Sequence, residues 1–204
     1  QFTSDHGWSF PDDAARLQPL IAEVHKRGVR VSLFMDPLPE AMAAAKEAGA
    51  DAVKFQTHTV EDEQANINVV APHFKGADRY NWVKRNTLAT PVWFWRELKK
   101  YCDEIGVVFF STPMSRGAAQ LLSEVGVDLW KVGSGDILDF VMLDYLASTQ
   151  KPIIISAGMS TLEEVDLAVD FLEKRNADFI LMHCVSKYPC PREELQLNTV
   201  KFFK

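Results

Sequence analysis

The sequence has few cysteines, no long hydrophobic run and no excess of positive charge. Its 204 residues include only 3 cysteines, Cys102, Cys184 and Cys190, and no Cys-x-x-Cys pair, so we expect neither a disulfide framework nor a cysteine zinc site. The net charge is -6 and no cluster of Lys and Arg stands out, which argues against a nucleic-acid partner. No apolar run approaches the roughly 18 residues that span a bilayer. We therefore expect a cytoplasmic protein with no membrane partner.

The composition that is present is typical of a folded globular chain. Apolar residues make up 47% and charged residues 25% of the sequence, which excludes the disordered and fibrous classes. The length suits one sizeable core. We therefore predict a single domain over residues 1–204.

Short apolar runs alternate with longer amphipathic stretches, the pattern of βα units around a parallel sheet. The runs predict six strands, at residues 29–35, 52–56, 107–111, 129–133, 152–156 and 179–184. The amphipathic stretches predict helices at residues 12–27, 39–48, 91–105, 116–125, 139–148, 161–174 and 192–203. Residues 61–86 show no clear period and are predicted to be an extended loop. The fold class is α/β, a (β/α) TIM-barrel type that is incomplete, because a complete barrel has eight strands and about 250 residues.

Polar residues follow the apolar runs, at the end of each strand where barrel enzymes carry their chemistry. The candidates are Lys54, Gln56, Thr112, Lys131, Ser134, Asp136, Ser156 and Tyr188. Two lysines within apolar strands are unfavourable unless they meet an anion. Small residues beside them offer hydroxyl and N–H donors, so the sequence predicts a phosphate or carboxylate site.

Plainer interpretations stay open at this point. Lys54 and Lys131 could each form a structural ion pair with a neighbouring strand. Gly133-Ser134-Gly135 could be only a turn, and His183 could be a hydrogen-bonded core histidine.

Five distinctive motifs follow one another along the chain: AGADAVKFQTHT at 48–59, FFSTPMS at 109–115, VGVDLWKVGSGDI at 125–137, KPIIISAGMSTLEEV at 151–165 and LMHCVSKYPCP at 181–191. Through these motifs the chain resembles, over about residues 47–204, the sialic acid (N-acetylneuraminate) synthase family. The motifs stand in the family's order and at similar spacing.

The resemblance implies a TIM-barrel synthase that condenses phosphoenolpyruvate with an N-acylated hexosamine such as N-acetylmannosamine. It also implies that the phosphate of this substrate is contacted by Lys54, Lys131, Ser134 and Ser156. Asp136 and Tyr188 would face the sugar, with Thr112 and Gln56 lining the same pocket, and Lys54, Lys131 and Asp136 would be catalytic. The resemblance also implies a divalent metal, Mn²⁺ or Mg²⁺, whose ligands in the family lie on later strands that this sequence does not include.

The first residues, up to about 50, resemble a different TIM barrel, pyridoxine 5′-phosphate synthase, through QFTSDHGW at 1–8 and VRVSLFMDP at 29–37. The chain therefore reads as a chimera of a segment 1–48 and a segment 49–204. Two alternatives to a working synthase follow: a chimeric or engineered scaffold without catalysis, and, as a lesser one, pyridoxine 5′-phosphate chemistry. Six strands leave two sheet edges, so we expect a homodimer.

Overall fold

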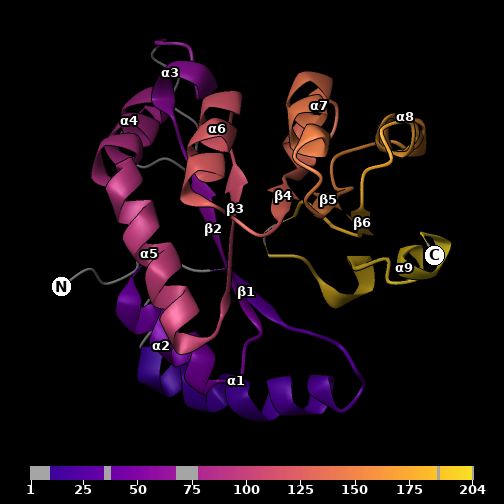
Figure 1. Cartoon of the computed structure of the whole chain (residues 1–204). Helices are drawn as coiled ribbons and strands as arrows, with labels where there is room; N and C mark the ends of the chain where they lie inside the picture. The colour runs from indigo at the N-terminus through magenta and orange to yellow at the C-terminus, as the bar shows by residue number, and fades with distance from the viewer. Residues whose placement is uncertain (1–9, 35–37, 68–77, 188, 204) are drawn as a thin grey trace. The chain divides into compact units, whose positions relative to one another are not determined.

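The computed structural model describes residues 10–34, 38–67, 78–187 and 189–203 of the chain (Figure 1). Its strands form one six-stranded sheet in the order β1-β2-β3-β4-β5-β6. The pairs β1/β2, β3/β4, β4/β5 and β5/β6 are parallel. The strands are β1 Ser32–Phe34, β2 Ala52–Thr57, β3 Val108–Pro113, β4 Trp130–Val132, β5 Ile153–Ser156 and β6 Phe179–Met182. The predicted α/β fold with six strands is thus confirmed.

Helices follow the strands as the periodicity predicts. The α-helices are α1 Phe10–His25, α2 Pro39–Glu47, α3 Val60–Glu63, α4 Arg79–Ala89, α5 Val92–Ile105, α6 Arg116–Val125, α7 Phe140–Ser148, α8 Leu162–Glu173 and α9 Thr199–Phe202, and the 3-10 turns are η1 Ser134–Asp136 and η2 Arg192–Glu194. Helix α6 has the predicted bounds.

Two expectations about the helical pattern are wrong. The helix predicted over residues 192–203 is divided into η2 and α9, because Gln196 between them adopts a left-handed φ of 49°. The predicted loop over residues 61–86 overlaps α3 and contains most of α4. The periodicity of α4 was weak because Val83 is its one buried residue among those described.

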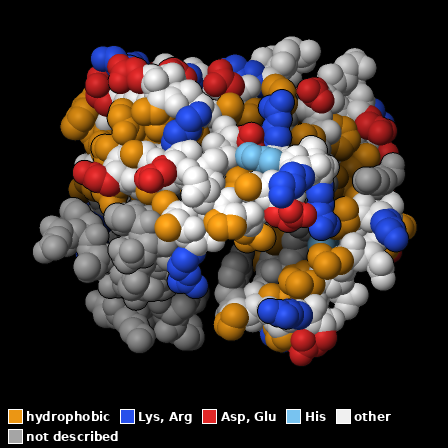
Figure 2. All heavy atoms as spheres, turned by 90° about the horizontal axis from the view of Figure 1, so that it is seen from below, with side chains coloured by type: hydrophobic (Ala, Val, Ile, Leu, Met, Phe, Trp, Pro, Cys, Tyr) orange, Lys and Arg blue, Asp and Glu red, His pale blue; other side chains and the backbone are white. Residues whose placement is uncertain are grey.

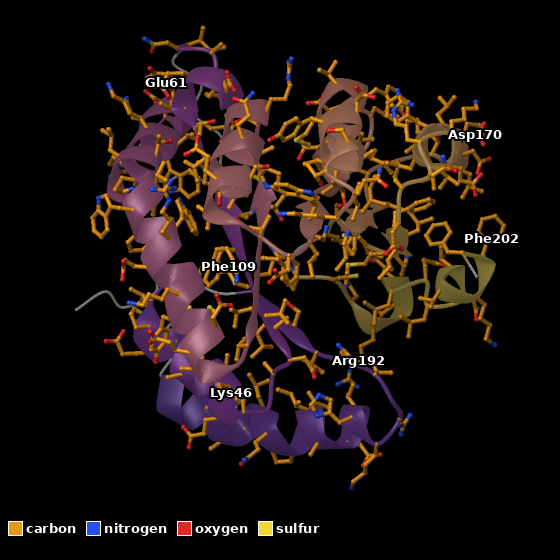
Figure 3. All side chains as sticks on the ribbon, viewed as in Figure 1. Lys46, Glu61, Phe109, Asp170, Arg192 and Phe202 are labelled. Atoms are coloured by element: carbon orange, nitrogen blue, oxygen red, sulfur yellow. The ribbon has the colours of Figure 1, made fainter. Side chains whose placement is uncertain are left out.

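The chain divides into two compact units. The first comprises residues 1–55 and 90–110. Its core contains an aromatic cluster in which Phe55, Trp95 and Phe109 lie with ring centroids 5.3–6.4 Å apart. Phe109 on β3 is labelled in Figure 3, beside α5. The Asp51 carboxylate accepts a hydrogen bond of 2.6 Å from the Val31 backbone, which holds the start of β2 to the chain before β1.

The second unit comprises residues 56–89 and 111–204. In it α6, α7 and α8 lie side by side in chain order (Figure 1). Each begins at a capping residue: Ser115 and Asp139 accept hydrogen bonds from the first turns of α6 and α7, and Thr161 forms a capping box with Glu164 on α8. The fully buried side chains of this unit include Trp130 and Leu143.

Strand β6 is the last strand of the sheet, and it is less covered than its neighbours. Ile180 is 59% exposed and Met182 is 42% exposed, whereas Ile153 and Ile155 on β5 are buried. A strand of a parallel sheet is ordinarily covered on both faces. Elsewhere, hydrophobic side chains are interspersed with charges of both signs on the face that Figure 2 shows. In the ranges that the structure describes, no helix is long and apolar enough to cross a membrane.

Candidate functional site

The register of the second unit brings sequence-predicted residues to one face of the sheet. Successive side chains of a strand point to opposite faces. Ser111 pairs with Trp130 across β3 and β4, so Thr112 lies on the same face as Lys131. Lys131 pairs with Ile154, which places Ser156 on that face too.

Lys131 is the most informative of these side chains. It is 7% exposed, and its ammonium donates hydrogen bonds to the Val132 carbonyl at 2.6 Å and to Ser156 Oγ at 2.5 Å. Both acceptors are neutral, and no carboxylate of the described residues lies within 4.0 Å of Nζ. Burial lowers the pKa of Lys131 from 10.5 to about 8. A buried ammonium without a counter-ion favours an anionic ligand.

Ser134 and Gly158 follow the ends of β4 and β5, the two strands that carry Lys131 and Ser156. The Gly158 N–H donates to Ser134 Oγ at 3.1 Å. A Cβ on Gly158 would lie 2.6 Å from Ser186 Oγ, 2.7 Å from Ser134 Oγ and 3.1 Å from Cys184 Sγ. Two hydroxyl groups and one thiol, from the ends of β4 and β6, therefore converge on this one backbone position.

Asp136 gives the site a second, acidic side. A Cβ on Gly133 would lie 3.2 Å from Asp136 Oδ2 and 3.9 Å from Thr112 Cγ2, so the carboxylate lies near Thr112. Burial, together with the negative charges of Asp139 and Glu63, raises the pKa of Asp136 to about 6, against the smaller effects of Lys131 and Arg79.

A buried network that the sequence analysis did not single out lies on this acidic side. His58 Nδ1 lies 2.7 Å from Glu63 Oε2, and Arg79 donates to Glu63 Oε1 at 3.0 Å. The His58 and Glu63 side chains are 8% and 5% exposed. The available signal was the position of His58 directly after β2, but Glu63 and Arg79 lie in the segment that showed no period.

The remaining predicted residues fall in different places. Gln56 is exposed on the part of β2 that belongs to the second unit. Lys54 is half-buried on β2, in the first unit. Tyr188 lies outside the described residues. Ser134, Gly135 and Asp136 form the turn η1, and His183 is half-buried with Nε2 2.8 Å from the Leu195 carbonyl.

The described residues do not by themselves fit the divalent metal that the resemblance implies. Among them, no group of three His, Cys, Asp or Glu side chains is arranged to hold a metal ion.

Comparison with known proteins finds similarity to one family over most of the chain. The NeuB family profile matches residues 41–204. The pseudaminic acid synthase of Helicobacter pylori is 33% identical over 165 residues, which are 78% of this chain and 48% of that protein. The crystal structure of N-acetylneuraminic acid synthetase from Leptospira borgpetersenii, in complex with citrate, superposes with a TM-score of 0.64 at 28% identity and covers 79% of this chain and 52% of that one. The chain spans about half the length of the curated relatives it matches.

A second family matches the N-terminal part. The profile of the pyridoxal phosphate biosynthesis protein PdxJ matches residues 1–78. Pyridoxine 5′-phosphate synthase of Albidiferax ferrireducens is 65% identical over 57 residues, which are 28% of this chain and 23% of that protein. The two family matches overlap between residues 41 and 78.

Proposed function

The chain belongs to the NeuB family, and we propose that it carries the phosphoenolpyruvate site of a synthase that makes sialic or related nonulosonic acids. The second substrate is an N-acylated hexosamine of the N-acetylmannosamine type. Relatives named as pseudaminic and N,N′-diacetyllegionaminic acid synthases support this substrate class.

The observation that carries the proposal is the buried Lys131 ammonium, whose hydrogen bonds go to Ser156 and a backbone carbonyl. A phosphate dianion would supply the missing negative charge, and charge-assisted hydrogen bonds in a buried site are strong. The Ser134 hydroxyl and the Gly158 N–H, 3.1 Å apart, are suited to the phosphate oxygens. Lys54 remains a proposed phosphate contact on the resemblance alone.

The reaction that we propose joins two carbons and releases phosphate. C3 of phosphoenolpyruvate forms a bond to the aldehyde carbon of the sugar, and the aldehyde oxygen takes up a proton. Water adds at C2, and the bond between C2 and the phosphate oxygen breaks. Lys131, Ser134 and Ser156 would hold the phosphate in position and stabilise its charge as it leaves.

Asp136 and Gln56 belong to the side that we assign to the sugar. A carboxylate accepts hydrogen bonds from hydroxyl and amide groups, which an N-acylated hexosamine has in number. Tyr188 remains a proposed sugar contact on the resemblance alone.

The proposal is tested by phosphate release from phosphoenolpyruvate with N-acetylmannosamine and Mn²⁺, beside calorimetric binding of phosphoenolpyruvate alone. Lys131→Ala is expected to lower phosphoenolpyruvate affinity at least tenfold. Lys174→Ala is the matched control, because Lys174 is exposed and contacts Asp170 on α8. Equal effects of the two substitutions on a folded protein would remove the assignment of Lys131.

The overlap of the two family matches supports a second proposal, that the chain is a chimera whose barrel serves as a scaffold. Phosphoenolpyruvate binding without phosphate release, in the folded chain, would favour this alternative. A further assay for pyridoxine 5′-phosphate synthesis would test the contribution of the N-terminal segment. Phosphate release that depends on Lys131 would exclude the inactive scaffold.

We also propose that the protein is a homodimer. The support is β6, the last strand of the sheet, whose side chains Ile180 and Met182 are exposed on one sheet face. Light scattering that gives the mass of one chain at micromolar concentration would contradict this proposal.

A further inference from the structure

We propose that His58 is a further substrate-positioning residue of this site, presenting its Nε2 atom to the amino sugar while Glu63 and Arg79 hold its ring in place. The inference rests on the proposed function, because it assigns a contact within the same site. It concerns residues outside the phosphate cradle of Lys131 and Ser156.

The His58 ring is held in one orientation by Glu63 and Arg79. Nδ1 lies 2.7 Å from Glu63 Oε2, and the other oxygen of the same carboxylate accepts from Arg79 at 3.0 Å. A carboxylate paired with a guanidinium accepts hydrogen bonds, so Nδ1 carries the proton in the neutral ring. Trp82 packs edge-on against the ring, with centroids 5.4 Å apart and planes at 86°.

The residues on either side of His58 are anchored by hydrogen bonds. On one side, Thr57 Oγ1 lies 2.8 Å from Ser111 Oγ, and on the other, Thr59 Oγ1 lies 2.5 Å from Ser115 Oγ. Both contacts join the end of β2 to residues of the β3 end. His58 is therefore held by its ring, and its two neighbours in the chain are anchored by their side chains.

The side-chain hydrogen bond of His58 to Glu63 leaves its Nε2 atom available to a ligand. Within the described ranges, Trp95 Nε1 is the one fully buried side-chain nitrogen or oxygen without a hydrogen-bond partner. His58 makes its side-chain hydrogen bond through Nδ1, so Nε2 is at an accessible position. A ring held by a carboxylate on one nitrogen presents the other as a directed acceptor.

The two proposed substrates differ in charge and therefore suit different parts of the site. Among the described residues, the ionisable groups in contact around His58 offer no unpaired cation: Glu63 contacts the ring, and Arg79 pairs with that same carboxylate. Phosphoenolpyruvate is an anion and is favoured at Lys131. A neutral sugar, with hydroxyl and amide donors, suits an acceptor nitrogen.

The test uses the full chain, with N-acetylmannosamine and phosphoenolpyruvate as separate calorimetric probes. His58→Gln is expected to weaken binding of N-acetylmannosamine about tenfold, as loss of one hydrogen bond would, and to change phosphoenolpyruvate binding less than twofold. His183→Gln is the matched control, because His183 bonds the Leu195 carbonyl in the same unit. The inference would be overturned if His58→Gln and His183→Gln weakened N-acetylmannosamine binding equally. It would also be overturned if His58→Gln weakened the binding of both probes equally.

A second measurement reports the ring itself and does not depend on ligand binding. Long-range ¹⁵N spectra distinguish the two histidine tautomers, and we expect His58 to be protonated on Nδ1. Glu63→Gln should abolish this preference, whereas Glu61→Gln, on the exposed side of the same helix, should keep it (Figure 3). An Nε2-protonated ring in the native protein would contradict the proposed orientation.

The outcomes separate this inference from the proposed function. Binding of phosphoenolpyruvate without any binding of N-acetylmannosamine would overturn the role of His58 and leave the phosphate site in place. Binding of neither ligand by the folded native chain would overturn both.

Discussion

Lys131 Nζ lies 2.5 Å from Ser156 Oγ, a contact between two neighbouring strands whose residues stand 25 positions apart in the sequence. The ammonium is held by neutral groups on the same sheet face as Thr112. A buried cation held by neutral groups destabilises the fold and favours the binding of an anion.

Replacing Lys131 with Met should stabilise the protein while weakening phosphoenolpyruvate binding. Because burial lowers the pKa of Lys131 to about 8, its charged form is penalised in the fold at neutral pH. Allowing for the lost hydrogen bonds, the free energy of unfolding should rise by about 2 kcal/mol at pH 7. Denaturant titration measures the change, which should shrink as the pH rises from about 8 towards 10.5. A destabilised variant at pH 7 would contradict the prediction.

Phosphoenolpyruvate affinity should fall as the pH rises above about 8. The free protein loses the Lys131 proton in that range, and the bound phosphate requires the ammonium. Calorimetry at pH 7, 8 and 9 should show a progressive loss that approaches tenfold per pH unit at the alkaline end. In Lys131→Met the same series should be nearly flat. A native chain whose affinity is constant from pH 7 to 9 would disprove this coupling.

Asp136→Asn should stabilise the protein at pH 8 and have little effect at pH 4. The pKa of Asp136 is raised to about 6, so the carboxylate destabilises the fold once it is ionised, and this effect is complete above about pH 6. We expect a gain of about 1–2 kcal/mol at pH 8, since the group is partly exposed. Thermal melts at both pH values provide the comparison. Asp144→Asn, at an exposed carboxylate on α7, serves as the control.

Gly158→Ala should disturb the phosphate cradle, and Gly135→Ala should not. An added Cβ at Gly158 would lie 2.6 Å from Ser186 Oγ and 2.7 Å from Ser134 Oγ, whereas nothing lies within 4 Å of one at Gly135. We expect Gly158→Ala to cost about 1–3 kcal/mol of stability and to weaken phosphoenolpyruvate binding. Paired melts and calorimetry of the two variants measure the contrast. Similar values for both would show that the close packing around Gly158 does not matter.

The fold could be predicted from the sequence because its signals are local. Each apolar run from residue 52 onward became a strand within a few residues of its predicted bounds, and the glycines Gly106 and Gly126 end α5 and α6 in the left-handed conformation. The prediction failed where the local signal was weak or interrupted. The short buried stripe of α4 gave no period, and the left-handed Gln196 divides the C-terminal helix.

The candidate site was predicted only in part. Polar residues at strand ends pointed to Lys131, Ser134, Asp136 and Ser156, because strand alternation is a property of the sequence alone. His58 was visible at a strand end, but its partners Glu63 and Arg79 come from α3 and from the start of α4, where no pattern drew attention.

The sequence by itself determined the six βα units, the residues at the strand ends and the resemblance to the sialic acid synthase family. The tertiary structure decided which of those residues meet. Whether Lys131 reaches Ser156 depends on strand register, and whether Arg79 pairs with the Glu63 carboxylate that holds His58 depends on the packing of α4 against α3. These contacts also set the burial that shifts the pKa values of Lys131 and Asp136, and burial is a property of the whole fold rather than of any local segment.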